Sequence, residues 1–302
     1  MTPTSTIDLH THTHYSDGKY SPAELLRYAA SIGLETIAIT DHDNANGVRE
    51  AWPLAQELGI ELVPAIEFAC HWNQCEAPPG NGEIDVLGYF VALSDPTFQA
   101  FERAALNDTY SRVADCCTRL TAAGYPISLD DVFAENPHYA GGVQLIFAMQ
   151  SKGYADSWDA AFRLVVEQWK QVRLSRFTIQ QVIEQIHLAG GVAILAHPTA
   201  VKCGDNWLQA DQLALLTEMG LDGLEVYHPR LDEKARAHFL ALAKQFNLLI
   251  SGGSDEHGWF RGLERIGNQP ITSEMVESLR ACHLERTRQL RGRSNGNPPG
   301  AA

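Results

Sequence analysis

The sequence predicts an α/β fold, a barrel of parallel strands that carries a small helical insertion. Three observations predict it. Short apolar runs, typical of buried strands, alternate with amphipathic segments, typical of helices, over most of the 302 residues. Histidine or carboxylate side chains stand beside most of the apolar runs. The alternation is interrupted once, between residues 94 and 177, where the pattern is helical.

The first expected strand covers residues 6–12 and carries an H-x-H pair. Because side chains alternate along a strand, Asp8, His10 and His12 share one face, and the apolar residues between them face the opposite layer. Two imidazoles and a carboxylate on one strand face make a poor core but a good platform for a metal ion. An isolated pair of this kind is also compatible with an exposed strand. The recurrence of such residues at the later strands favours the metal platform.

The later apolar runs place further histidines and carboxylates where strands stop. Residues 37–40 lead to Asp41, His42 and Asp43, residues 60–66 to Glu67, residues 192–196 to His197, residues 224–227 to His228, and residues 248–250 to Asp255 and His257, while residues 84–90 carry Asp85 near their beginning. The active sites of (β/α) barrels gather at the carboxyl ends of the strands. We therefore expect these side chains to meet at one rim.

Helices with clear boundaries lie between the strands. Ser21 and Glu24 form a capping box, with Pro22 at the first helical position. Thr178 opens a second helix, and Asp232 caps a third whose apolar positions recur at helical spacing. This alternation of strands and helices predicts a parallel sheet.

Residues 94–177 are expected to form a small helical domain inserted into the barrel. Helices are expected over residues 101–123, from residue 131, over residues 144–152 and over residues 157–169. The predicted division is 1–93 for the first part of the barrel, 94–177 for the insertion, 178–290 for the second part and 291–302 for a disordered tail. Near the end of the insertion, Arg173 and Arg176 form either an electropositive wall for an anionic substrate or a solvated face.

Composition excludes several classes of protein. A chain of 302 residues with 45% hydrophobic content can bury one barrel core and an insertion. No apolar run is long enough to span a membrane, and the six cysteines show no C-x-x-C pair. The amino-terminal pattern lacks an apolar leader region, so we expect no secretory leader. We therefore expect a cytoplasmic protein with reduced thiols, no membrane association and no obligate protein partner. The formal net charge of −14 disfavours nonspecific affinity for nucleic acid, and bound cations would neutralise part of it.

The motifs, taken in order, resemble those of the PHP family, named for bacterial DNA polymerases and histidinol phosphatase. They are Asp8-Leu9-His10-x-His12, Ser16-Asp17-Gly18, Ile39-Thr40-Asp41-His42-Asp43, Glu67, Ala196-His197-Pro198 and Gly253-Ser254-Asp255-x-His257-Gly258. The chain is most similar to the branch that contains 3′,5′-nucleotide bisphosphate phosphatases and 5′-to-3′ exoribonucleases. The resemblance implies a distorted (β/α)7, TIM-like PHP barrel with two to three divalent ions, usually Mn, Fe or Zn, with Mg also possible.

The resemblance also implies a set of metal ligands. His10, His12, Glu67 and Asp255 would hold the first ion, Glu67, Asp85 and His197 the second, and Asp17, His42 and His257 the third. Water activated by the ions would attack the phosphoester, with Glu67 and Asp255 as catalytic side chains. We add His228 as a third catalytic candidate, because it directly follows an expected barrel strand. Asp8, Asp41 and Asp43 are expected to orient ligands or cap loops.

Two departures from the family pattern change the expectation. At the position of Asp85 the family usually has His, and a carboxylate favours Mn, Mg or Fe over Zn. The alternative is that Asp85 faces the surface and that the second ion is weak or absent. Where this branch has an Arg-x-His pair that contacts phosphate, the chain has Gly142-Val143-Gln144. The candidates that replace this pair in binding substrate are His138, Arg173, Arg176, His228 and Arg230.

The resulting functional prediction is a metal-dependent phosphoesterase. It would hydrolyse phosphate monoesters of a small phosphorylated metabolite, preferably a nucleotide of the 3′,5′-bisphosphate type. Three alternatives stay open: a 5′-to-3′ exonuclease on short RNA or DNA, a metal-dependent hydrolase with altered bond specificity, and a noncatalytic module that binds metal or nucleotide.

Overall fold

The computed structural model describes residues 4–73, 83–203, 206–259 and 262–295. Its centre is a curled seven-stranded sheet with the strand order β1-β2-β3-β4-β5-β8-β9, which makes a distorted TIM-like barrel. The strands are β1 Ile7–Thr11, β2 Thr36–Ile39, β3 Glu61–His71, β4 Glu83–Tyr89, β5 Val192–Leu195, β8 Gly223–Tyr227 and β9 Leu249–Gly252. A separate two-stranded sheet joins β6 Lys202–Cys203 to β7 Asn206–Trp207, after a short 3-10 helix, Pro198–Ala200.

The direction of β4 corrects the expectation of an all-parallel sheet. β4 runs antiparallel to both of its neighbours, β3 and β5, whereas the remaining paired strands are parallel. A parallel partner of β3 would need a long crossover, and the connection from His71 to Glu83 is too short to provide one. Asp85, near the beginning of β4, consequently lies at the rim where the parallel strands end. Glu67 lies within β3 and not at its end, because β3 continues to His71 along its pairing with β4.

The two edge strands of the sheet, β1 and β9, approach each other, and the segment after β9 bonds to β1. The backbone N–H of Asp255 donates to the carbonyl of His10 at 2.9 Å, and the N–H of His12 donates to the carbonyl of Glu256 at 3.1 Å. A Cβ atom on Gly253 would lie 2.3 Å from the backbone nitrogen of His10, so this approach requires glycine. The closure places the segment after β9 directly against the H-x-H pair of β1.

Helices cover the sheet as the capping signals predicted. They are α1 Pro22–Ser31, α2 Asn46–Leu58, α7 Ile179–Leu188, α8 Ala210–Glu218, α9 Glu233–Phe246 and α10 Ser273–Asn295. The capping box of Ser21 and Glu24 is formed, and Thr178 caps α7 in the same way. One apolar cluster joins one face of the sheet to α1, α2, α7, α8 and α9, and a second joins the other face to α10.

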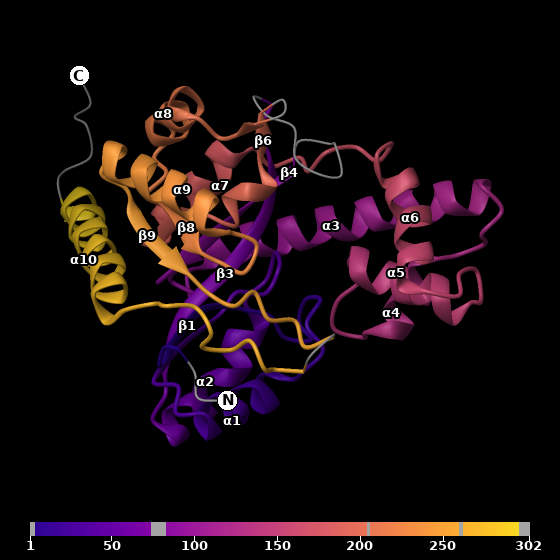
Figure 1. The fold of residues 1–302 in the computed structure, drawn as a ribbon, viewed down its shortest axis with the longest axis horizontal. Helices are drawn as coiled ribbons and strands as arrows, with labels where there is room; N and C mark the ends of the chain where they lie inside the picture. The colour runs from indigo at the N-terminus through magenta and orange to yellow at the C-terminus, as the bar shows by residue number, and fades with distance from the viewer. Residues whose placement is uncertain (1–3, 74–82, 204–205, 260–261, 296–302) are drawn as a thin grey trace.

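Four helices follow β4 and have an apolar cluster of their own. They are α3 Pro96–Ala122, α4 Leu129–Glu135, α5 Gly142–Ser151 and α6 Trp158–Trp169. In Figure 1, α3 leads away from the sheet toward α4, α5 and α6, on the side opposite α10. The helix α10 continues to Asn295, so residues 291–295, which were expected in a disordered tail, are helical.

Two compositional expectations can be compared with the structure. Within the part of the chain that the structure describes, every helix is too short or too polar to span a bilayer. The cysteines whose side chains are described, Cys70, Cys116, Cys117 and Cys282, are free thiols.

Candidate metal centre

Four side chains meet at the rim where β1, β3 and the segment after β9 come together. The Nε2 atoms of His10 and His12 are 3.1 Å apart, and they lie 3.2 and 3.3 Å from Oε2 of Glu67. Oδ1 of Asp255 is 3.4 Å from Nε2 of His10 and 3.3 Å from Nε2 of His12. Ligands that share one ion at about 2.1 Å lie about 3.0 to 3.4 Å from one another. The two imidazoles therefore have the spacing of ligands that share an ion, both with Glu67 and with Asp255.

A second group shares Glu67 with the first. Its other carboxylate oxygen, Oε1, is 3.1 Å from Nε2 of His197, which is 3.8 Å from Oδ2 of Asp85. Glu67 is fully buried; its Oε2 faces the first group and also lies 3.4 Å from Nδ1 of His42, whereas Oε1 faces His197. A carboxylate in this position can bridge two cations and reduce their mutual repulsion.

A third group consists of Asp17, His42 and His257. Oδ1 of Asp17 lies 3.1 Å from Nε2 of His257 and 3.8 Å from Nε2 of His42. This oxygen is buried and accepts no hydrogen bond, despite the short distance to His257. A carboxylate oxygen and a ring nitrogen that are close without forming a hydrogen bond are typical of two ligands directed at one ion.

The hydrogen bonds of two histidines fix which ring nitrogen carries the proton. Nδ1 of His10 donates to Oε1 of Glu225 at 2.7 Å, and Nδ1 of His257 donates to the carbonyl oxygen of Asp255 at 2.9 Å. Both partners can only accept, so the proton is on Nδ1 and the lone pair on Nε2 faces the cluster. This is the arrangement that a metal-binding histidine requires.

Carboxylates around the cluster orient its members, as the sequence indicated for Asp8, Asp41 and Asp43. Ser16 Oγ donates to Oδ1 of Asp41 at 2.7 Å and can therefore accept the Nδ1 proton of His12, which is 3.3 Å away. Asp8 accepts the backbone N–H groups of residues 254 and 267, and Asp43 accepts that of residue 69. The chain connections around the centre are thus held by buried carboxylates.

Glu225 belongs to the site and was missed by the sequence analysis. It is fully buried in β8, where it accepts the Nδ1 proton of His10 and, at 2.7 Å, the backbone N–H of His197. One signal could have revealed it. A carboxylate inside the apolar run 224–227 is not expected in a barrel core without a partner. In the sequence analysis, residues 224–227 served only as the strand that leads to His228, so Glu225 within that strand was not considered.

The pKa values of the clustered side chains are shifted by burial and by the charges of their neighbours. Burial opposes protonation of His12, but Asp255 and Glu67 outweigh it and raise the pKa of His12 to about 10. Burial favours the neutral form of Glu67, yet the charges of His10 and His42 hold the pKa of this carboxyl well below its usual value. Burial and the charge of Glu67 raise the pKa of Asp85 to about 7. The protons on His12 and Asp85 thus neutralise negative charge that bound metal ions would otherwise neutralise.

Unusual backbone conformations coincide with the cluster. His197 has a φ of 27°, Asp255 of 50° and Asp43 of 57°, all in the region that disfavours residues other than glycine. Such conformations persist where the surrounding contacts determine them, and they gather at functional sites. In His197 and Asp255 they accompany side chains that face the metal groups, and in Asp43 a carboxylate that holds the backbone of residue 69.

His228 lies beside the centre, but both of its nitrogens are in use. It is buried, its Nε2 is 3.1 Å from Oδ2 of Asp255, and its Nδ1 accepts the backbone N–H of Arg230 at 3.0 Å. The ring therefore positions Asp255. Arg230 is exposed, and its charge lowers the pKa of Asp85 against the larger effects of burial and Glu67.

The structure does not bring Arg173, Arg176 or His138 to the centre. Arg173 pairs with the buried carboxylate of Asp108 at 2.7 Å, and Arg176 lies 3.8 Å from the same carboxylate. A buried carboxylate needs a cationic partner, which explains why these two arginines face α3 instead of a substrate. His138 stacks on His14 at a ring distance of 4.2 Å and lines a separate cavity of about 310 Å³.

Two cavities adjoin the centre. The first has a volume of about 320 Å³ and joins Asp17, His42 and Asp85 to apolar side chains of the helical insertion, among them Val143, Ile146, Trp158, Phe162, Val166 and Trp169. The second has a volume of about 260 Å³ and is lined by Asp17, Val143, Trp158, His228, Arg230, Asp255, His257, Trp259 and Arg265, with three further residues, Pro229, Ser254 and Glu256. Val143 and Trp158 line both cavities, so the insertion contributes to the walls of the centre.

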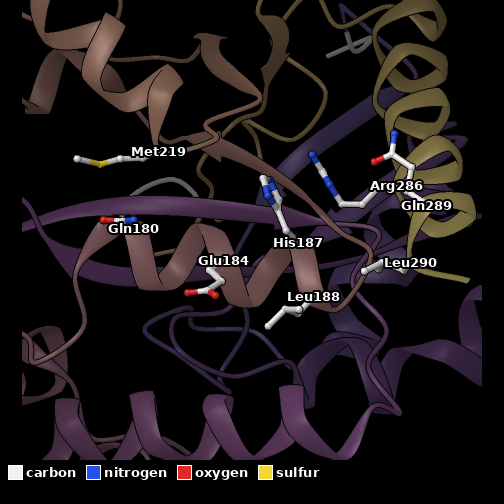
Figure 2. Close-up of a pocket in the computed structure, with 8 residues that line it drawn as sticks. All are labelled: Gln180, Glu184, His187, Leu188, Met219, Arg286, Gln289 and Leu290. Atoms are coloured by element: carbon white, nitrogen blue, oxygen red, sulfur yellow. The ribbon is translucent and has the colours of Figure 1, made fainter. Parts of the chain in front are cut away.

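A larger cavity, of about 510 Å³, lies away from the centre between α7 and α10 (Figure 2). None of the expected ligands lines it. His187 and Arg286, which line it, both pair with Asp222, at 2.9 and 2.7 Å. This network joins α10 to the loop before β8, and we assign it a structural role.

Comparisons with known proteins agree with this geometry. The chain is 31% identical over 267 residues to a 5′-3′ exoribonuclease of Haemophilus influenzae, covering 85% of this chain and 92% of that protein. It is 29% identical to a phosphoribosyl 1,2-cyclic phosphate 1,2-diphosphodiesterase of Eggerthella lenta (86% and 97% covered) and 25% identical to a 3′,5′-nucleoside bisphosphate phosphatase of Chromobacterium violaceum (87% and 90%).

A solved structure from Bifidobacterium adolescentis, described as a metal-dependent phosphoesterase, superposes with a TM-score of 0.78 at 26% identity and covers 91% of this chain and 96% of that one. The family profile of the PHP domain matches residues 8–215. The match covers more than half of the chain and includes the strands that supply most of the cluster. This chain therefore belongs to the PHP domain family.

Proposed function

We propose that the three groups of side chains hold two to three divalent ions and that the protein uses them to hydrolyse phosphoesters. One observation carries the proposal: the Nε2 atoms of His10 and His12 and Oε2 of Glu67 lie 3.1 to 3.3 Å from one another, and Oδ1 of Asp255 lies 3.3 to 3.4 Å from both Nε2 atoms. Glu67 is the candidate bridge to a second ion with Asp85 and His197. The carboxylate of Asp85 favours Mn, Mg or Fe at that position.

Divalent ions in such a site lower the pKa of bound water toward neutrality and neutralise phosphoryl oxygens. The side chains of the protein have separate tasks. Glu225 and Ser16 keep the lone pairs of His10 and His12 directed inward, and His228 holds Asp255.

The proposed substrate is a nucleotide. Its support is the first cavity, where aromatic and aliphatic side chains of the insertion stand next to Asp17 and His42. A flat, apolar base fits beside tryptophan, and the phosphoester would then face the cluster. A hydrolase for nucleoside bisphosphates would have this arrangement, as would an exonuclease that accepts the end of an RNA.

The exonuclease is the second candidate, and two observations favour it. The Haemophilus influenzae relative, at 31% identity, is named an exoribonuclease. Trp158, Phe162 and Trp169 line one cavity, and successive bases can stack on such side chains.

Metal analysis and an activity assay test the proposal together. The purified protein is expected to contain at least two divalent ions per chain and to release phosphate from nucleotides when Mn²⁺ is supplied. His12→Ala and Asp255→Ala should abolish both properties. His238→Ala, a histidine in α9 that bonds the carbonyl of Leu208, is the matched control and should retain them. Less than one ion per chain, or activity that survives in both variants, would contradict the metal centre.

A substrate panel separates the remaining alternatives. It compares a nucleoside 3′,5′-bisphosphate, a 5′-phosphorylated short RNA, a sugar phosphate and an amide. Release of single nucleotides from RNA, with mononucleotides left intact, would favour the exonuclease. Cleavage of the amide alone would indicate an altered bond specificity. A metal-loaded protein that cleaves nothing in the panel would be a binding module.

A further inference from the structure

The second cavity beside the centre is lined by both acidic and basic side chains. Three of the lining residues, Asp17, Asp255 and His257, belong to the metal groups. Arg230 and Arg265 line the cavity as well, and they come from the loops after β8 and after β9. The sequence analysis singled out Arg230 but not Arg265. The helical insertion contributes Val143 and Trp158, neither of which is cationic.

Within the described residues, neither guanidinium group forms a hydrogen bond or an ion pair, although the charge of Arg230 lowers the pKa of Asp85. This is unusual in a chain in which acidic residues outnumber basic ones by 37 to 23. Other arginines near buried positions are paired, such as Arg49 with Glu102 at 2.6 Å and Arg286 with Asp222 at 2.7 Å. Guanidinium groups that form no ion pair beside an enzyme centre are available to an anionic ligand.

The backbone of each arginine is fixed to the centre. The N–H of Arg230 donates to Nδ1 of His228 at 3.0 Å, and His228 in turn contacts Asp255. The N–H of Arg265 donates to Oε2 of Glu256 at 3.1 Å. Oε1 of this buried glutamate accepts two further backbone N–H groups, from residues 257 and 258. Both arginine side chains therefore start from backbone positions that are tied to the metal groups.

The cavity is larger than one phosphate group. Its volume of about 260 Å³ corresponds to about eight water molecules at the density of the liquid. A phosphoester held against Asp255 and His257 would leave room for a second tetrahedral group toward the arginines.

We propose that this cavity is a second anion subsite, in which Arg230 and Arg265 hold a phosphate of the substrate other than the one that is hydrolysed. The proposal rests on the proposed phosphoesterase function. It assigns the recognition of the distal phosphate to two loops of the barrel, whereas the insertion supplies the apolar contacts. It also makes Arg265 a specificity-determining residue.

The test compares two substrates that differ in one phosphate. Arg230→Met, Arg265→Met and the double variant are assayed with a nucleoside 3′,5′-bisphosphate and with the matching nucleoside monophosphate. Methionine keeps the backbone N–H bonds to His228 and Glu256. Each single variant is expected to raise KM for the bisphosphate about tenfold or more, because one charge-assisted contact is lost. The kcat/KM for the monophosphate should stay within about twofold of wild type.

Arg27→Met/Arg103→Met, which removes the same charge from exposed positions of α1 and α3, is the matched control and should change neither substrate. An equal loss with both substrates would mean that the arginines hold the phosphate that is cleaved, and it would overturn the proposal. No change with either substrate would overturn it as well.

A binding measurement separates this subsite from the catalytic function. Calorimetry with a non-hydrolysable phosphonate analogue of the bisphosphate reports affinity whether or not the protein cleaves nucleotides. If no substrate is hydrolysed, the phosphoesterase function fails, but weaker binding by the double variant than by wild type would still support the subsite. Equal affinity of the two proteins, or no binding by either, would exclude it.

Discussion

Replacement of Glu225 by Gln tests how the centre is held together. Oε1 of Glu225 accepts the Nδ1 proton of His10, and Oε2 accepts the N–H of His197, each at 2.7 Å. Glutamine offers one oxygen and one NH₂ group. If the NH₂ faces His197, two donors oppose each other. If it faces His10, Nδ1 must accept, so the proton moves to Nε2 and this atom can no longer bind a metal.

Either orientation has a cost that can be worked out from these contacts. One buried donor without a partner destabilises the folded protein by about 1 to 3 kcal/mol. Loss of the group that orients a metal-binding histidine lowers metal affinity by about 10- to 100-fold. Both effects are expected in Glu225→Gln, because the residue is fully buried and water cannot replace the lost bond.

Titration of metal-depleted protein with Mn²⁺ by calorimetry measures the affinity, and urea unfolding measures the free energy of unfolding. Hydrolytic activity should return when Mn²⁺ is raised by the factor that affinity has lost. Glu57→Gln, on the exposed face of α2, is the control and should behave as wild type. Wild-type Mn²⁺ affinity in Glu225→Gln would refute the role assigned to this carboxylate.

Three further predictions follow from the geometry of the centre. Burial opposes protonation of His12, but Asp255 and Glu67 raise its pKa to about 10, so a metal ion must displace a proton when it binds. The affinity for Mn²⁺ should therefore rise between about pH 6 and pH 9, by up to about tenfold per pH unit for each proton displaced. An affinity that does not change with pH would contradict this prediction. Asp85→Asn should remove about one ion per chain in metal analysis; an unchanged ion content would place Asp85 outside the centre. Gly253→Ala should lower stability by about 1 to 3 kcal/mol, since its Cβ would lie 2.3 Å from a backbone nitrogen; an unchanged melting temperature would argue against the tight closure.

Local patterns were sufficient to predict most of the barrel. Apolar runs and capping residues depend on neighbours a few positions away, so the strands and the starts of α1, α7 and α9 could be predicted. The direction of β4 could not, because an apolar run looks the same in either direction. It is decided by the short connection to β3 and by pairing with β5.

The sequence by itself determined that histidines and carboxylates would gather at one rim, because residue type and strand alternation fix which side chains reach it. Only the tertiary structure decided which charged side chains form ion pairs with each other and which stay available to a ligand. Asp108 pairs with Arg173, 65 residues away, and Glu225 supports His10 from a separation of 215 residues. Such long-range pairs depend on the packed positions of distant elements, and no local pattern records them. They remove Arg173 from the centre and leave Arg230 and Arg265 beside it.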